Sequence, residues 1–390
     1  MRIEDDLWIR YLKTKVIMNC LKTLWLLPIK KGKFLFLSFD GKQFSDSPKY
    51  IYEFLEKGHD NFEFVWAFFE PEKFDYLVER GIKVIKRNSF DFVKDFATSE
   101  YIITNNFIPS YLPVRKSQVL LNTWHGGSPL KTVGYMESNP NPYNDYYYKK
   151  LQNHKYTAFL SSSDFVTHEV IGDSFAYKST VLPFGMPRNA ILLGPHDEIV
   201  DKVYSHFNLS RGLDKGIVLY APTFRGSFQQ GTFLPKEQQL DIDAFLNALT
   251  RSTGKEYSFL FRAHHTMMDS MSGDDVIFAT DYSDMQELLC AADVLITDYS
   301  SCMGDMALMK KPVFLYTPDL EEYIKERGFY WDIYSLPFPI AKSNAEIVSL
   351  VESFDTEEYK SGVQKYLDRL GSYETAQSTK KTVDWLLKQK

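Results

Sequence analysis

Polar and basic side chains follow several short apolar runs of this sequence, at the points where buried strands would end. These residues are His125, Thr223, Arg225, Arg262, His264, Asp298, Ser300 and Ser301. Arginine suits two-pronged recognition of phosphate, and histidine exchanges a proton near neutral pH. The set predicts transfer of a group from a nucleotide diphosphate donor, in which one histidine removes a hydroxyl proton and the basic groups hold the phosphates.

The stretch from Asp293 to Asp305 combines a buried strand with a hydroxyl-rich turn. Val294–Thr297 is an apolar, β-branched run, and Ser300 or Ser301 is expected to cap a helix that enters at Cys302. The turn would then present backbone N–H groups and hydroxyls to an anion, most often a phosphate. The alternative is an ordinary capped β-α turn.

Strands that alternate with helices predict a parallel, doubly wound α/β sheet in each half of the chain. The expected strands of the first half are 33–39, 62–69, 84–86, 101–104, 119–123, 157–160 and 179–182, and those of the second half are 216–220, 257–261, 294–297 and 312–316. Because ligands bind at the carboxyl ends of such strands, we expect a cleft between the two halves. A loop rich in Asn, Pro and Tyr, from Ser138 to Tyr148, could serve as a lid.

Residues 7–27 mix apolar and basic side chains at helical spacing, and Pro28 ends the pattern. Trp8, Trp25 and the lysines that follow suit an amphipathic helix on an anionic membrane surface. The alternative is a helix packed on its own domain.

The composition and the motifs that are missing argue against several classes of protein. The net charge of −6 argues against a general nucleic-acid binder, and three widely spaced cysteines indicate neither a disulfide framework nor a zinc site. Walker, dinucleotide-binding and serine-hydrolase signatures are missing from the sequence. Asp241 and Asp243 have the Asp-x-Asp spacing of some metal-dependent transferases, but they open a helix, where acids are favoured anyway. No metal and no cofactor are expected.

An ordered set of motifs resembles the CDP-glycerol glycerophosphotransferase family of bacterial teichoic-acid and capsule synthesis. The motifs are Ser38-Phe-x-Gly41-Lys-x-x-x-Asp46-x-Pro48, Thr123-Trp-His-Gly126, Pro129-Leu-Lys131, Gly185-x-Pro-Arg-Asn189, Tyr220-Ala-Pro-Thr-Phe-Arg225, Arg262-x-His264, Ile296-Thr-Asp-Tyr-Ser-Ser301 with Asp305, and Tyr316-x-Pro-Asp319 with Arg327-Gly-Phe329. As a set they are specific, although each motif alone is weak.

The resemblance implies a glycosyltransferase-B-like fold with two Rossmann-like domains. It implies an N-terminal amphipathic membrane helix over 1–33, an acceptor domain over 34–188, a CDP-donor domain over 189–350, and C-terminal helices over 351–390 that cross back. The implied reaction transfers glycerol phosphate from CDP-glycerol to a hydroxyl of a lipid-linked acceptor, with release of CMP, at the cytoplasmic face of the bacterial membrane.

The resemblance also implies a role for each matched residue. His125 would be the base, and His264 would contact the reacting phosphate with Arg262 beside it. Thr223 and Arg225 would lie near the nucleotide, and Gly126 and Lys131 on the acceptor side. Asp298, Ser300, Ser301 and Asp305 would lie around the pyrophosphate and the glycerol.

Several positions depart from the family pattern. Gly127-Ser128 replaces a single residue, His265 replaces proline, Ala190 replaces aspartate, and Gly304 replaces a large apolar residue. These departures leave open CDP-ribitol as the donor, a polymerase instead of a priming enzyme, and, more remotely, a nucleotide-sugar glycosyltransferase of the same fold. The length of the chain favours a priming or single-unit transferase, or a compact capsule polymerase.

Overall fold

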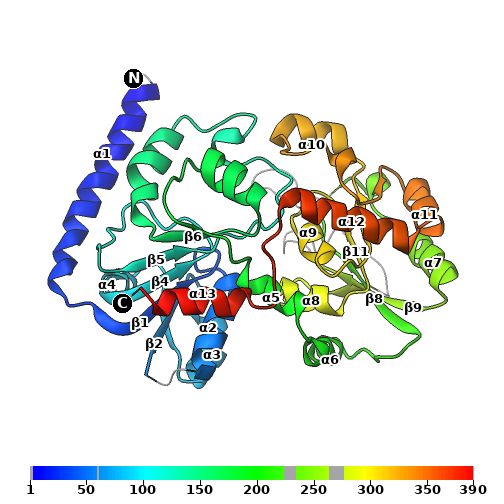
Figure 1. Ribbon diagram of the computed structural model, residues 1–390, viewed down its shortest axis with the longest axis horizontal. Coiled ribbons are helices and arrows are strands. Elements are labelled where there is room, and N and C mark those ends of the chain that lie inside the picture. The colour runs from blue at the N-terminus through cyan, green and yellow to red at the C-terminus, as the bar shows by residue number, and fades with distance from the viewer. Residues whose placement is uncertain (1–2, 59–60, 224–233, 263–275, 390) are drawn as a thin grey trace. The chain divides into compact units, whose positions relative to one another are not determined.

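The computed structural model describes residues 3–58, 61–223, 234–262 and 276–389. By contacts the chain divides into two compact units, which are described one at a time (Figure 1). The N-terminal unit comprises Met1–His125, Val133–Ala190 and Tyr373–Lys390, and the C-terminal unit comprises Gly126–Thr132 and Ile191–Ser372. Each unit contains one parallel sheet, which confirms the predicted pair of doubly wound α/β folds.

The sheet of the N-terminal unit is parallel throughout its described strands, in the order β3-β2-β1-β4-β5-β6-β7. The strands are β1 (Lys30–Leu37), β2 (Glu63–Phe68), β3 (Lys83–Lys86), β4 (Ser99–Thr104), β5 (Val119–Asn122), β6 (Ala158–Leu160) and β7 (Val181–Leu182). Their order reverses direction between β1 and β4, so the carboxyl edge of this pair is the switch point of the sheet. Phe34, Phe36 and Trp66 are fully buried in its core.

Helices flank this sheet and fix the loops at its carboxyl edge. They are α2 (Asp46–Gly58), α3 (Asp75–Glu79), α4 (Phe90–Thr98) and α13 (Ser378–Leu387), with π-helical segments at Asp145–Gln152 and Val166–Ser174. Val383 and Leu386 of α13 pack into the core of the N-terminal unit, although they lie at the end of the chain.

The C-terminal unit has a second parallel sheet of described strands, in the order β10-β9-β8-β11-β12-β13. The strands are β8 (Lys215–Tyr220), β9 (Glu256–Phe261), β10 (Val276–Phe278), β11 (Val294–Thr297), β12 (Val313–Tyr316) and β13 (Ile340–Ala341). The helices are α6 (Asp197–His206), α7 (Ile242–Thr253), α8 (Met285–Ala291), α9 (Cys302–Ala307), α10 (Leu320–Arg327), α11 (Asn344–Glu352) and α12 (Thr356–Leu370), and α5 (Ala190–Leu193) lies where the chain passes between the units. The order of this sheet reverses between β8 and β11.

The N-terminal helix α1 (Ile3–Leu21) continues as a 3-10 turn, η1 (Lys22–Leu26), which ends before Pro28 as the sequence predicts. One face of α1 packs on the N-terminal unit, where Met18 is buried, the Tyr11 ring lies 5.3 Å from Tyr146, and Arg10 stacks on Tyr143. The other face exposes Trp8, Ile9, Leu12, Val16 and Ile17. The helix therefore packs on its own unit and still presents apolar side chains outward. The expectation that α1 is amphipathic is wrong, because its apolar and charged side chains are spread around the helix and are not separated onto two faces. Among the described helices, none combines the length and the apolar character needed to cross a membrane.

The local structure differs from the sequence expectations at three places. The loop expected over Ser138–Tyr148 ends early, because Asp145 already begins a π-helical segment that packs against α1. The helix α9 begins at Cys302 with Ser301 as its N-cap residue, as expected, but the side chain of Ser301 makes no capping hydrogen bond, and the Cys302 amide instead donates to Oγ of Ser300 at 3.5 Å. Two strands were missed, β10 and β13, which are three and two residues long and too short to show a periodic pattern.

Candidate active site

His125 follows β5 in the N-terminal unit, and its imidazole ring is held in one orientation. The Nδ1 atom lies 2.8 Å from the backbone oxygen of Asn105, which follows β4. A carbonyl oxygen only accepts hydrogen bonds, so Nδ1 carries the proton and in the neutral ring Nε2 carries the lone pair. The structure thus gives His125 the tautomer that a base acting through Nε2 requires.

The backbone around His125 adopts conformations that are uncommon for residues with side chains. Trp124 has φ +54° and Phe39 has φ +46°. The ring centroid of Trp124 lies 4.2 Å from that of His125, and the ring of Phe39 lies 5.4 Å away. The amide of Phe39 donates to Oδ1 of Asn105 at 2.7 Å. Asn105 is therefore hydrogen-bonded both to the loop that follows β1 and to His125. Strain of this kind is typical of functional sites.

A buried ion pair holds the backbone of the same turn in place. Arg188 donates from Nη1 to Oδ2 of Asp46 and to the backbone oxygen of His125, each at 2.6 Å. The side chains of Arg188 and Asp46 are almost fully buried, and Asp46 has φ +60°. A buried charge pair with additional hydrogen bonds is costly to break, so this pair fixes the position of the His125 main chain.

These residues gather at the switch point of the N-terminal sheet. Phe39 and Asp46 follow β1, Asn105 follows β4, and His125 follows the adjacent strand β5. Doubly wound sheets bind their ligands at this place, so the position of His125 agrees with a catalytic role.

In the C-terminal unit, Thr223 and Asp298 meet at the corresponding switch point, between β8 and β11. The amide of Thr223 donates to both carboxylate oxygens of Asp298, at 2.8 and 3.0 Å, and the Asp298 side chain is 1% exposed. Thr297 also donates from its hydroxyl to the backbone oxygen of Ala221 at 2.7 Å. The carboxylate of Asp298 therefore braces two strand-end loops against each other, a role that the sequence did not predict.

Arg262 follows β9, next to this switch point. Its backbone amide donates to the backbone oxygen of Tyr220 at 2.9 Å. Its Nη1 atom donates to the Sδ atom of Met285 at 3.5 Å, and a thioether is a weak acceptor. Burial lowers the pKa of Arg262, and the carboxylate of Asp284 opposes this shift. Within the described residues, the guanidinium thus retains donor capacity that a phosphate could use.

The residues expected around the pyrophosphate are only partly exposed. Ser300 and Ser301 are half-buried, and the Oγ atom of Ser300 lies 3.5 Å from the amide of Cys302. Asp305 is buried, and it accepts a hydrogen bond from Nε2 of Gln286 at 3.0 Å. Asp305 therefore has a structural partner that the sequence did not reveal.

The two residues expected on the acceptor side, Gly126 and Lys131, lie in a segment that belongs to the C-terminal unit by contacts. Lys131 forms an isolated antiparallel bridge with Phe329, and Thr132 donates to the backbone oxygen of Gly328 at 3.2 Å. Two of the predicted motifs, Pro129-Leu-Lys131 and Arg327-Gly-Phe329, are thus paired in space. His264, His265 and Arg225 lie outside the described residues, so their predicted roles remain predictions.

Sequence reasoning did not assign site roles to Asn105, Asp46 or Arg188. Asp46 and Arg188 stand within two of the recognised motifs, so those motifs were the available signal. Asn105 acts through its backbone oxygen on His125, which leaves no signature in the residue type.

Comparison with known proteins identifies a family that this chain matches. The model of the family described as CDP-glycerol:poly(glycerophosphate) glycerophosphotransferase matches residues 19–388. The teichoic acid poly(glycerol phosphate) polymerase of Bacillus subtilis (strain 168) is 31% identical over 97% of this chain and 52% of its own length. The teichoic acid poly(ribitol-phosphate) polymerase of Bacillus spizizenii is 29% identical over 94% of this chain and 58% of its own length.

The chain therefore spans about half the length of these curated relatives. A solved structure of the wall teichoic acid polymerase TagF, a histidine-to-asparagine variant soaked with CDPG, matches 100% of this chain and 98% of that chain. Its TM-score is 0.78 at 26% sequence identity.

Proposed function

Because this chain belongs to the CDP-glycerol:poly(glycerophosphate) glycerophosphotransferase family, we propose that it transfers glycerol phosphate from CDP-glycerol to a hydroxyl of a lipid-linked glycan or polyol-phosphate acceptor in the synthesis of teichoic acid or a related surface polymer. The observation that carries the proposal is the fixed tautomer of His125 at the switch point of the N-terminal sheet. A histidine with its lone pair on Nε2 is suited to remove the proton of an acceptor hydroxyl.

The proposed reaction has one displacement at phosphorus. The acceptor oxygen bonds to the phosphorus that carries glycerol, and the bond from that phosphorus to the bridging oxygen of the pyrophosphate breaks. CMP leaves with that oxygen, and the acceptor proton passes to Nε2 of His125. Positioning and electrostatic stabilisation supply most of the catalysis in such transfers.

For the C-terminal unit, the proposal assigns the phosphates of the donor to the β8, β9 and β11 strand ends. Arg262 supplies a half-buried guanidinium there, and Ser300 and Ser301 supply hydroxyls. Thr223 and Asp305 are proposed to shape the same region, with Asp298 as the brace between its loops. The proposed roles of Arg225, His264, Gly126 and Lys131 rest on their places in the motifs.

We further propose that the protein acts at the cytoplasmic face of a bacterial membrane, where a lipid-linked acceptor would be found. The support is the outer face of α1, which exposes Trp8, Leu12 and Val16. Apolar side chains next to lysines suit an interfacial position on an anionic bilayer.

A CDP-ribitol donor is the second candidate, because a relative named for poly(ribitol-phosphate) synthesis matches 94% of this chain. A longer polyol would change the shape of the donor pocket and leave the phosphate chemistry unchanged.

The test is release of the nucleotide product in the presence of a lipid-linked disaccharide acceptor, which is CMP with CDP-glycerol or CDP-ribitol as the donor and UDP with a UDP-sugar. We expect turnover with a CDP-polyol, its loss in His125→Ala, and its retention in His168→Ala, which changes an exposed histidine elsewhere in the N-terminal unit. Undiminished CMP release by His125→Ala would overturn the catalytic assignment. Turnover with the UDP-sugar alone would overturn the reaction class.

A further inference from the structure

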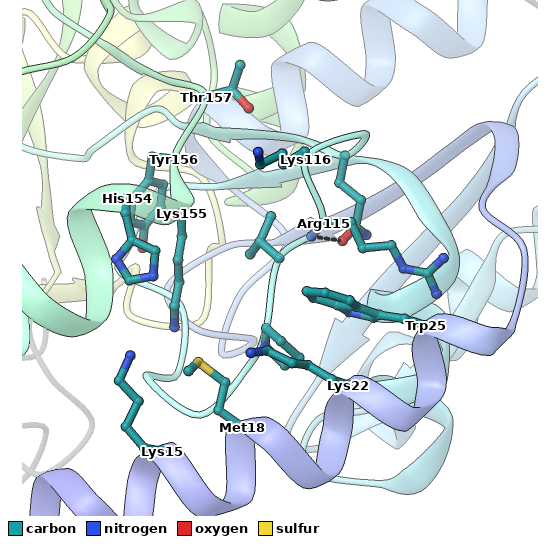
Figure 2. Close-up of a pocket in the computed structure, with 13 residues that line it drawn as sticks. Lys15, Met18, Lys22, Trp25, Arg115, Lys116, His154, Lys155, Tyr156 and Thr157 are labelled. Atoms are coloured by element: carbon teal, nitrogen blue, oxygen red, sulfur yellow. Dashed lines mark hydrogen bonds between the residues drawn. The ribbon is translucent and has the colours of Figure 1, made fainter.

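A pocket of about 420 Å³ lies beneath α1 in the N-terminal unit (Figure 2). One wall is formed by α1 and η1, and the other by residues 113–118 and 154–157, which precede β5 and β6. His125 follows β5, so this pocket lies at the opposite edge of the sheet from the candidate active site. Its volume falls within the range of small-molecule sites, roughly 300–1,000 Å³.

The lining of the pocket is strongly basic. Six of its side chains are lysine, arginine or histidine, namely Lys15, Lys22, Arg115, Lys116, His154 and Lys155. None of the lining residues, all within the described part of the chain, is an aspartate or a glutamate. Basic groups gathered in a concave, partly desolvated place create a positive potential that attracts anions.

Lys155 shows that the pocket is partly desolvated as well as basic. Its side chain is 5% exposed, and its ammonium group donates to the backbone oxygen of Ser110 at 2.7 Å. Burial, reinforced by the charge of Lys15, lowers the pKa of Lys155 to about 7. In Figure 2 the ammonium ends of Lys15 and Lys155 point toward each other across the pocket. An anion between them would relieve both repulsion and desolvation.

Arg115 holds the two walls together. Its Nη2 atom donates to the backbone oxygens of Leu24 and Leu27, at 2.9 and 2.8 Å, and thereby anchors the end of η1 to the loop before β5. These bonds hold the two walls of the pocket at a fixed spacing, as in pre-organised binding sites.

Apolar side chains adjoin the basic lining and distinguish among anions. Met18 and Trp25 line the pocket, and the Trp25 side chain is also 37% exposed. Inorganic phosphate would gain nothing from these side chains, whereas the glycerol and acyl portions of a phospholipid would bury them.

The geometry points to a binding site for the phosphodiester headgroup of an anionic phospholipid in the pocket formed by Lys15, Lys22, Lys116 and Lys155, with Trp25 against the acyl region. This inference deepens the membrane attachment proposed above and rests on it. It is separate from the transfer reaction, because it involves none of the residues assigned to catalysis or to donor binding.

The test is isothermal titration of the full chain with dihexanoyl phosphatidylglycerol below its micelle concentration. Dihexanoyl phosphatidylcholine and inorganic phosphate are titrated in parallel. We expect saturable binding of the phosphatidylglycerol, at least about tenfold tighter than either comparison, because the pocket offers several cations to one anionic group next to apolar surface. Equal binding of inorganic phosphate would show a free-phosphate site and overturn the lipid assignment, and so would an absence of binding.

Two triple variants locate the site. Lys15→Gln, Lys22→Gln and Lys116→Gln together remove three pocket cations. Lys13→Gln, Lys31→Gln and Lys178→Gln remove the same charge from exposed positions outside the pocket. We expect the pocket variant to lose at least about tenfold in affinity, because it removes three cations that would surround the bound anion, and the outside variant to stay close to wild type. Equal losses in both variants would overturn the site.

Release of CMP, measured in detergent with each variant, separates this inference from the proposed reaction. We expect both triple variants to turn over at wild-type rate with a soluble acceptor. Loss of lipid binding with normal turnover supports the pocket assignment. If no CDP-polyol is turned over by the wild type, the proposed reaction fails and the lipid titration still decides the pocket.

Discussion

Ser128 occupies the space next to Gly304 in the C-terminal unit. A Cβ atom placed on Gly304 would lie 2.2 Å from the Cβ atom of Ser128 and 2.5 Å from its hydroxyl oxygen. The motif resemblance predicts a shorter loop at Ser128 and a large apolar residue at position 304. The contact between Ser128 and Gly304 fits two departures that compensate each other. Ser128 also hydrogen bonds with Tyr366, whose pKa burial raises to about 12.

The first prediction concerns this pair. Gly304→Ala should lower the free energy of unfolding by about 1–3 kcal/mol, because the new methyl group overlaps Ser128. In the Ser128→Gly background the same substitution should be neutral or stabilising by up to ~1 kcal/mol, because alanine favours a helix more than glycine does. Urea unfolding of the four proteins of the cycle measures the coupling. Additive effects of the two substitutions would contradict the contact.

The second prediction concerns the ion pair under His125. Arg188→Met should destabilise the chain by about 3–5 kcal/mol, because it leaves the carboxylate of Asp46 buried without its partner. Adding Asp46→Asn should restore part of that stability, since asparagine carries no charge and tolerates the positive φ of position 46. Thermal unfolding of the single and double variants provides the measurement. A double variant less stable than Arg188→Met would argue against the pair as the cause.

The third prediction tests whether Asp298 only holds two strand-end loops together or also contacts the CDP-polyol substrate. Asp298→Asn keeps an oxygen that can accept from the Thr223 amide, so stability should change by less than about 1 kcal/mol and kcat by less than tenfold. Asp298→Ala leaves that buried amide without its carboxylate acceptor and should cost about 1–3 kcal/mol. Chemical unfolding and release of CMP are measured on both variants. If Asp298→Asn loses turnover at full stability, the negative charge itself acts on the donor.

The fourth prediction uses the lowered pKa of Lys155. The unfolded chain keeps this proton up to the ordinary lysine pKa of 10.5, whereas the folded chain loses it near pH 7. Between these values the unfolded state binds more protons, so the free energy of unfolding of the wild type should rise with pH. Relative to Lys155→Met, the wild type should gain ~1–2 kcal/mol from pH 7 to pH 9.

Unfolding titrations of both proteins at the two pH values test this expectation. The window avoids the titration of His154, which faces Lys155 and whose pKa is lowered by burial and by the charges of Lys155 and Lys15. Parallel pH profiles for the two proteins would show that Lys155 is charged and well solvated in the fold.

Much of this architecture follows from the amino-acid sequence alone. The buried strands appear as short apolar and β-branched runs, and parallel strands covered on both faces must be apolar along their whole length. The motifs likewise identified His125, Arg262 and Asp298 as residues beyond strand ends, which is where the structure has them.

Only the tertiary structure decided what these side chains do. The tautomer of His125 depends on a backbone oxygen twenty residues earlier in the chain, and the charge of Arg188 is balanced by Asp46 from a different loop. A sequence pattern reports which residues alternate between core and solvent, but it does not report which distant atoms lie within hydrogen-bonding distance. For the same reason the sequence shows only that position 304 is a glycine, and the contact with Ser128 that leaves no space for a side chain there is visible only in the fold.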